Sequence, residues 1–275
     1  MPTRSSIANR KLQIAIFVLS LTTCCLLLLT SHSSPVYSIS PLEQAQNDYS
    51  FQLSKYQDAK AKFDNTRANY QTYQTAIAKS DLYRQTKDYF AQICDLYISY
   101  FLLVNERANS VNWDHSSYKK DDQSKLVADE LASIRNIKSQ AQNTQKLEDY
   151  NEQFKNLKAN IQSSGLPIAN SVLKTTDVVQ IEETAAIFFQ NADALDKYAL
   201  SKISDNNKPL YNDWKSQIDT YKQTIQKEVD ADKSYLKLHT SPNDPQTATF
   251  KPDNQNAQNI LNQPIGKLTE ILKYL

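Results

Sequence analysis

The chain has 275 residues, a formal net charge of +1 at pH 7, two glycines and three cysteines. Beyond residue 30, 28 basic residues face 30 acidic ones, and this balance provides no basic footprint for nucleic acid. The glycine shortage excludes phosphate-cradling loops and dinucleotide-binding fingerprints, which need glycine where the backbone approaches a ligand. It also argues against sandwiches and barrels with many tight turns, whereas long helices avoid glycine. The composition therefore predicts an all-α protein.

Residues 12–30 are a stretch of nineteen residues without a charge, preceded by Arg4, Arg10 and Lys11. No further lysine or arginine occurs before Lys55. A helix of roughly 20 apolar residues spans the bilayer core, and flanking cations stay on the cytoplasmic side. We therefore expect a single-pass transmembrane signal-anchor helix in the cell membrane, with the C-terminal domain extracytoplasmic.

Under this interpretation, residues 1–11 form a short cytoplasmic N-terminus and residues 31–40 a juxtamembrane linker. The alternative is a secreted form after cleavage near Ser38, because a secretory signal has the same basic start and apolar centre. Against cleavage, the apolar stretch is longer than the roughly 7 to 15 residues of a signal core. Lipidation at Cys24 or Cys25 is disfavoured because the apolar stretch continues after them.

Ser40, Pro41 and Glu43 form a helix start signal, in which the serine and glutamate side chains can bond the first free amides. Large residues then recur with a seven-residue period, with Tyr73 at the companion position, and form a candidate interaction seam. The seam residues are Leu42, Tyr49, Tyr56, Phe63, Tyr70, Tyr73 and Ile77. Such a period is typical of coiled coils. We expect one continuous helix over residues 41–79, with its packing partners along this seam.

The segment 82–104 keeps apolar side chains three and four positions apart, which predicts the most buried helix of a bundle. The segment 109–123 lacks this period and is expected to form a surface loop. Trp113 and Tyr118 in this loop are a candidate contact patch, with anchoring of the loop as the alternative role.

A second long helix is predicted over residues 124–161, and its polar stretch at 139–145 is expected to change the packing face. Gly165 and Pro167 follow it. Glycine is common just after a helix end, and proline is common in the first turn of a helix. We therefore expect one helix to end at Gly165 and the next to begin at Pro167.

Asp177 and Gln180 resemble a capping pair for a third bundle helix that ends near Ile203. A fourth amphipathic stripe occupies residues 211–236. Together these elements predict a helical bundle with coiled-coil character over residues 41–238.

The tail of the chain is divided into two parts. Residues 239–258 contain three prolines and few apolar side chains, which predicts a flexible linker. Residues 259–275 have leucines and isoleucines at helical spacing, which predicts a short C-terminal amphipathic helix. The expected fold class is thus an N-terminal transmembrane helix followed by an extracytoplasmic antiparallel helical bundle.

Metal-supported catalysis in a helical bundle commonly uses glutamate and histidine three residues apart, and the sequence has no such pair. His32, His115 and His239 do not have the spacing of a zinc motif. Cys94 is the single cysteine beyond residue 30 and has apolar neighbours, so we expect a buried thiol. We therefore predict no catalytic, metal-binding or cofactor-binding residue, and a protein that is not an enzyme.

The expected function is a noncatalytic interaction or scaffold module of the cell envelope, which acts through helix–helix contacts. Its partners would be the membrane, through residues 12–30, and protein helices in a homo- or hetero-oligomer. The first alternative is a sensory or solute-binding bundle, which would signal through a partner because residues 1–11 are too short for an output domain. An enzyme with a site assembled from distant residues is the least favoured alternative.

Overall fold

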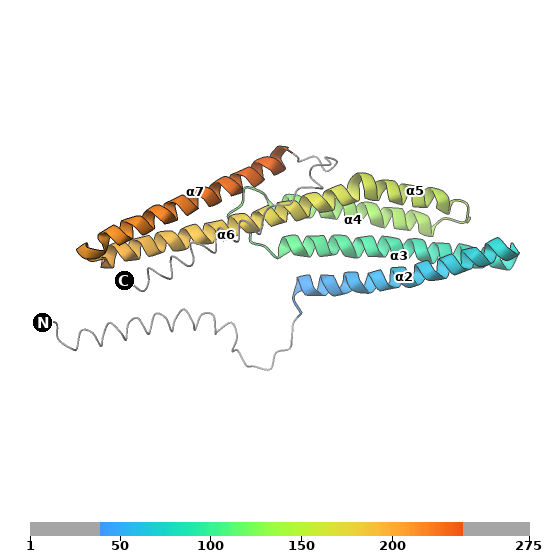
Figure 1. Cartoon of the computed structure of the whole chain (residues 1–275). Helices are drawn as coiled ribbons and strands as arrows, with labels where there is room; N and C mark the ends of the chain where they lie inside the picture. Colours follow the sequence, from blue (N-terminus) through green and yellow to red (C-terminus); the bar gives the residue numbers. More distant parts are fainter. Residues whose placement is uncertain (1–38, 239–275) are drawn as a thin grey trace. The chain divides into compact units, whose positions relative to one another are not determined.

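The structure, a computed structural model, describes residues 39–238, whose helices belong to one compact unit that begins at Pro41. These helices are α2 (Pro41–Tyr73), α3 (Ala76–Asn109), α4 (Lys120–Gln142), α5 (Tyr150–Asn160), α6 (Leu166–Lys202) and α7 (Lys208–Leu238) (Figure 1). No strand occurs between residues 39 and 238, and the all-α prediction is confirmed for this range.

None of the described helices combines the length and the apolar character that a bilayer crossing requires. The predicted N-terminus and membrane anchor, with most of the juxtamembrane linker, lie outside the described residues, because the description begins at residue 39. The predicted linker at 239–258 and the predicted C-terminal helix at 259–275 lie outside them as well.

Helices α2 and α3 form an antiparallel hairpin. Helix α2 begins at Pro41, as predicted, but it ends at Tyr73 rather than continuing to residue 79. Gln74 has a φ of 49°, in the left-handed region, and reverses the chain. The Thr75 side chain then accepts a hydrogen bond from the Ala78 amide at 3.1 Å and caps α3. The prediction of one helix over residues 41–79 is therefore wrong.

Helix α3 is central among the described helices, since it packs against α2, α4, α5 and α6. Phe90, Cys94, Phe101 and Val104 on α3 are at most 1% exposed, and they lie three, four and seven positions apart on one face. These side chains pack in one cluster with Ile134 of α4 and other buried residues of the neighbouring helices. The predicted burial of this apolar face is confirmed, although α6 has more buried residues than α3, twelve against nine.

The predicted helix over 124–161 is interrupted after Gln142, so that prediction is wrong. Distant side chains satisfy the carbonyls at this interruption. The Tyr150 hydroxyl donates to the Ala141 carbonyl at 2.8 Å, the Tyr83 hydroxyl to the Thr144 carbonyl at 2.7 Å and the Lys87 ammonium to the Gln142 carbonyl at 2.9 Å. These tertiary bonds replace the intrahelical ones, which removes the cost of ending the helix.

Helices α5 and α6 are parts of one continuous helical run, because residues Ile161–Gly165 between them form a π-helical turn. Gly165 has a helical φ of −57° and does not end the helix. Pro167 follows the π turn, where the regular hydrogen-bond ladder is already interrupted and a missing amide costs little. The predicted helix boundary at Gly165 and Pro167 is therefore wrong.

Asp177 and Gln180 lie in the middle of α6, so the predicted capping pair is also wrong. Both residues instead contact Arg107 of α3: Gln180 accepts a hydrogen bond at 2.8 Å, and Asp177 forms an ion pair at 3.7 Å. The predicted end of this helix near Ile203 is confirmed, since α6 ends at Lys202.

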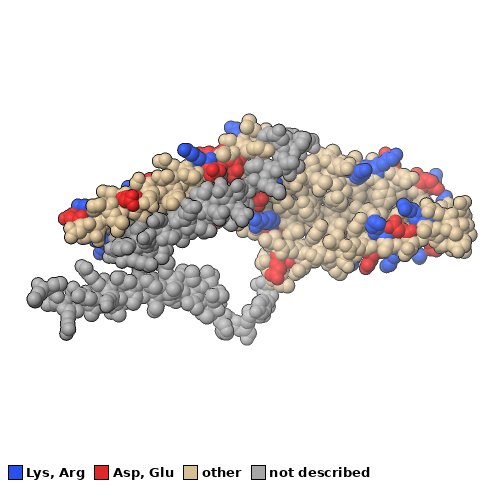
Figure 2. Space-filling model, in the orientation of Figure 1, with Lys and Arg blue, Asp and Glu red and all other residues tan. Residues whose placement is uncertain are grey.

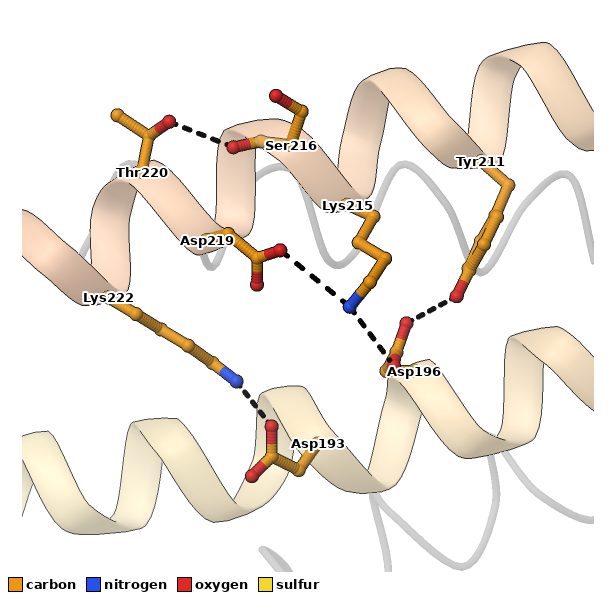
Figure 3. Close-up of polar contacts among 8 residues, drawn as sticks. All are labelled: Asp193, Asp196, Tyr211, Lys215, Ser216, Asp219, Thr220 and Lys222. Carbon is orange, nitrogen blue, oxygen red and sulfur yellow. Dashed lines mark hydrogen bonds and ion pairs between the residues drawn. The ribbon is translucent and has the colours of Figure 1, made fainter.

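Helix α7 returns antiparallel along α6, and polar side chains join the two helices along their edge (Figure 3). Lys222 pairs with Asp193. Lys215 pairs with Asp196 at 3.4 Å, and the Tyr211 hydroxyl donates to the same carboxylate. The predicted apolar stripe faces this contact. Its buried residues are Tyr211, Trp214, Ile218, Ile225, Val229 and Leu236.

Candidate functional site

A groove of about 740 Å³ lies between α2, α3 and the segment 147–154. Its volume is in the range of small-molecule and side-chain binding sites. Apolar and aromatic side chains form most of its lining, and charged side chains stand at its rim. The lining residues are Lys60, Phe63, Asp64, Arg67, Leu82, Thr86, Tyr89, Ile93, Leu147, Glu148, Tyr150, Asn151 and Phe154.

Tyr89 is the centre of the aromatic wall, because rings from two other elements surround it. The ring centroid of Phe63 lies 4.9 Å away in a stacked arrangement, that of Tyr56 5.8 Å away and that of Phe154 6.0 Å away. Burial, together with a side-chain hydrogen bond to Tyr56, raises the pKa of the Tyr89 hydroxyl. The hydroxyl is therefore neutral at physiological pH.

The rim carries two ion pairs and one cation without a carboxylate partner. Lys60 pairs with Asp64 at 2.7 Å, and Lys79 pairs with Glu148 at 2.7 Å. The hydrogen bond between Lys79 and Glu148 raises the pKa of the ammonium and lowers that of the carboxyl. The Arg67 guanidinium lies 5.6 Å from the Phe63 ring centroid and has no ion pair among residues 39–238.

Charge elsewhere is mixed. On the face that Figure 2 displays, Lys and Arg side chains alternate with Asp and Glu side chains across the described helices. No single-sign area of the displayed surface matches the footprint that a nucleic-acid phosphate backbone requires. Within the groove, the features available for recognition are the aromatic wall and the Arg67 guanidinium, which has no ion pair among residues 39–238.

The structure places the central part of the predicted seam against α3 of the same chain. Tyr49 contacts Tyr100 of α3, with ring centroids 6.0 Å apart, while Tyr56 and Phe63 contact Tyr89. Leu42 and Tyr70 are half-buried on α2. At the turn of the hairpin, Tyr73 is 67% exposed and Ile77 is 78% exposed. The seam thus has a covered centre and an open end.

Sequence reasoning missed the partners of the seam in the groove. Tyr89 comes from α3 and Phe154 from α5, and the sequence pattern places each of them only within its own predicted helix. Arg67 lies outside the seven-residue period, so the period does not identify it as a groove residue. The alternation of three and four positions in α3 identified Tyr89 as an inward-facing residue, but it gave no information on which helix it faces.

Trp113 and Tyr118, the predicted contact patch of the loop, are both half-buried, and hydrogen bonds connect the loop to the bundle. The Trp113 indole donates to the Ala108 carbonyl at 2.9 Å, and the Tyr118 amide donates to the Ser116 hydroxyl at 3.1 Å. Ser116 in turn donates to the buried carboxylate of Glu182 on α6. The same carboxylate pairs with Lys233 of α7 at 2.8 Å.

His115 lies exposed in the same loop. Within residues 39–238, no group of three or more histidine, cysteine, aspartate or glutamate side chains is arranged to hold a metal ion. Cys94 is fully buried, as predicted, and burial raises the pKa of its thiol to about 12. A thiol with this pKa is protonated at neutral pH and is a poor nucleophile.

Comparison with known proteins assigns no family to this chain, since no family model, curated protein or solved structure matches it.

Proposed function

We propose that this protein is a noncatalytic interaction module that binds a helix of a partner protein in the groove between α2, α3 and α5. The observation that carries the proposal is the aromatic groove beside the seam, with Arg67 unpaired at its rim. In the same proposal, residues 12–30 anchor the protein in the cell membrane and present the bundle on the extracytoplasmic side.

The chemistry of the groove defines the partner. An amphipathic helix presents apolar side chains at positions i, i+3 or i+4, and i+7, and these suit a groove lined by Phe63, Tyr89 and Phe154. Arg67 adds selectivity, because a guanidinium at a rim pairs well with a carboxylate. We therefore propose a partner helix with an acidic residue beside its apolar face.

Photo-cross-linking in intact membranes tests this proposal. A photoreactive phenylalanine analogue replaces Asn151, which is exposed and lines the groove, or Lys158, which is exposed on α5 outside the groove lining. We expect a protein adduct from position 151, none from position 158, and at least a fivefold weaker adduct from position 151 when Arg67→Glu is added. Adducts of equal yield at both positions, or none at position 151, would contradict groove binding.

The predicted orientation has its own test. Protease added to sealed cells or spheroplasts should digest residues 41–238 while cytosolic proteins stay intact. N-terminal sequencing of the membrane form distinguishes a retained anchor from a form cleaved near Ser38. Full protection of the bundle in sealed cells, with digestion only after lysis, would place it on the cytoplasmic side.

A solute-binding bundle is the second candidate function, favoured by the neutral Tyr89 hydroxyl among stacked rings and by the Arg67 guanidinium, which lies over Phe63 and has no ion pair among residues 39–238. A small aromatic or sugar-like anion would suit this lining. A thermal-shift screen of such solutes should show a shift that Arg67→Glu abolishes. The absence of any shift across the panel would rule this function out in favour of helix binding.

A further inference from the structure

The outer half of the α6–α7 hairpin contains a second apolar core that the described helices build from only two elements. Its buried residues come from α6 and α7 alone. The largest of them are Ile181, Phe188, Tyr211, Trp214, Ile218 and Ile225. Two helices touch along one stripe each, so a pair by itself does not enclose large side chains, yet each of these residues is at most 8% exposed.

Trp214 shows that this core needs a further element. Its side chain is only 4% exposed, and its indole Nε1 is buried without a hydrogen-bond partner in the structure. Among residues 39–238, α6 is the one helix that packs along α7 over this stretch. A buried indole N–H normally has an acceptor, and an unpaired one destabilises the folded state.

We infer that residues 259–275 of the same chain dock on the α6–α7 hairpin as its third helix. These residues lie outside the described range, and the argument for them is from sequence. On a helical projection, Leu261, Ile265, Leu268, Ile271, Leu272 and Leu275 share one face. Lys267, Glu270 and Lys273 take the opposite side, which suits a helix that is covered on one face only.

The length of the chain permits this docking. Helix α7 ends at Leu238, and Trp214 lies about 36 Å back along its axis at 1.5 Å per residue. Residues 239–258 could extend over about 66 Å, so residue 259 can be placed anywhere along the hairpin. Pro264 suits the first turn of a helix, so the regular helix would cover residues 264–275 and be about 18 Å long, which is about two thirds of the roughly 27 Å from Tyr211 to Val229.

The segment also offers acceptors for the unpaired indole. Asn259, Asn262 and Gln263 precede or begin the apolar repeat, and each has a side-chain amide oxygen. A cluster of such amides at one end of the docked helix could satisfy Trp214 Nε1 without placing a charge in the core. This inference is independent of the partner helix proposed for the groove, since the two surfaces share no residue.

Cross-linking of the full-length protein in detergent tests the docking directly. A photoreactive phenylalanine analogue at Leu268 should form intramolecular cross-links to α7 or α6 within the hairpin, mapped by mass spectrometry. The same analogue at Lys273, on the opposite side, should yield at least fivefold less of these cross-links. Cross-links from position 268 to α2–α5, to a second copy, or to no protein residue would overturn the inference.

Tryptophan fluorescence provides a second readout that does not depend on cross-linking. The chain has two tryptophans, so Trp113→Phe leaves Trp214 as the reporter. Leu268→Asp should shift the emission to longer wavelength and raise acrylamide quenching at least threefold, with Lys273→Ala as the control. Hydrogen exchange should increase in α6 and α7 and stay unchanged in α3 and α4. Unchanged quenching in Leu268→Asp, or faster exchange throughout the bundle, would overturn the inference.

Discussion

Glu130 of α4 is 3% exposed, and its two carboxylate oxygens have different surroundings. Oε2 accepts a hydrogen bond from the Ser164 hydroxyl at 2.7 Å, whereas Oε1 has no partner in the structure. A Cβ atom built on Gly165 would lie 3.2 Å from Oε1 and 3.7 Å from the Phe101 ring. Glycine therefore permits the close approach of α4 and the π turn, since a Cβ atom here would displace the Glu130 carboxylate by a few tenths of an ångström.

Gly165→Ala measures this close approach. Alanine gains about 1 kcal/mol of helix propensity, but overpacking of a fixed neighbour costs about 1–3 kcal/mol. We expect a net loss of about 1 kcal/mol in urea unfolding. In a Glu130→Ala background the same substitution should become stabilising, because the crowded oxygen is gone. Equal effects of Gly165→Ala in both backgrounds would show that the contact has no energetic weight.

Burial of Cys94 determines how readily its thiol reacts. Because its pKa is raised to about 12, the thiol remains protonated at pH 8, and a thiolate is required for alkylation. We expect no labelling of Cys94 by iodoacetamide in the folded protein and complete labelling in urea, measured by peptide mass spectrometry. Labelling of the folded protein within minutes would mean that this part of α3 opens readily.

At the scale of elements, the end of α2 is decided by a single backbone position, Gln74. The seven-residue period of α2 predicted its helix and its aromatic face, because the period records a local apolar stripe. It gave no warning of the reversal at Gln74, since glutamine is a good helix former and no glycine or proline marks the turn. Tyr73 and Ile77 beside the turn fit the predicted seam as well as its covered residues do. The sequence pattern therefore did not indicate that these two side chains are exposed.

Substitution of Gln74 tests the left-handed turn. A non-glycine residue in this region costs about 1 kcal/mol, so Gln74→Gly should raise the free energy of unfolding by about that amount. Gln74→Val should lower it, because a β-branched side chain is disfavoured at positive φ. Both values follow from urea denaturation monitored by circular dichroism. A loss of stability in Gln74→Gly would mean that this turn is not left-handed in solution.

At the scale of the whole molecule, long-range polar contacts hold the described helices in register. Arg107 joins α3 to α6, Glu182 joins the 110–119 loop, α6 and α7, and Lys222 joins α7 to α6. The last of these pairs involves an exposed carboxylate, and its contribution is below about 1 kcal/mol. Such pairs select one packing arrangement and add little to total stability.

The pair between Asp193 and Lys222 predicts a pH dependence. The hydrogen bond from Lys222 lowers the pKa of Asp193 below its usual value of 3.8 in the folded state. Its stabilisation is complete above about pH 4 and is lost as the pH falls through the lowered pKa. We expect Asp193→Asn to flatten the loss of stability below pH 4, measured by thermal unfolding. Lys222→Gln should have the same effect. If the original protein and both variants lose stability equally steeply below pH 4, the predicted role of this pair is contradicted.

The sequence by itself determined the helical class, the start of α2, the end of α6 and the buried stripe of α7, because each is recorded in local composition and periodicity. Only the tertiary structure decided where the helices are interrupted and what their faces contact. The end of α4 coincides with hydrogen bonds from Tyr83, Lys87 and Tyr150, α5 and α6 are connected through the π-helical turn Ile161–Gly165, and three elements that meet at Tyr89 form the aromatic groove. Amphipathic spacing identifies the covered face of a helix, but the free energy that selects its neighbour comes from residues distant in the chain.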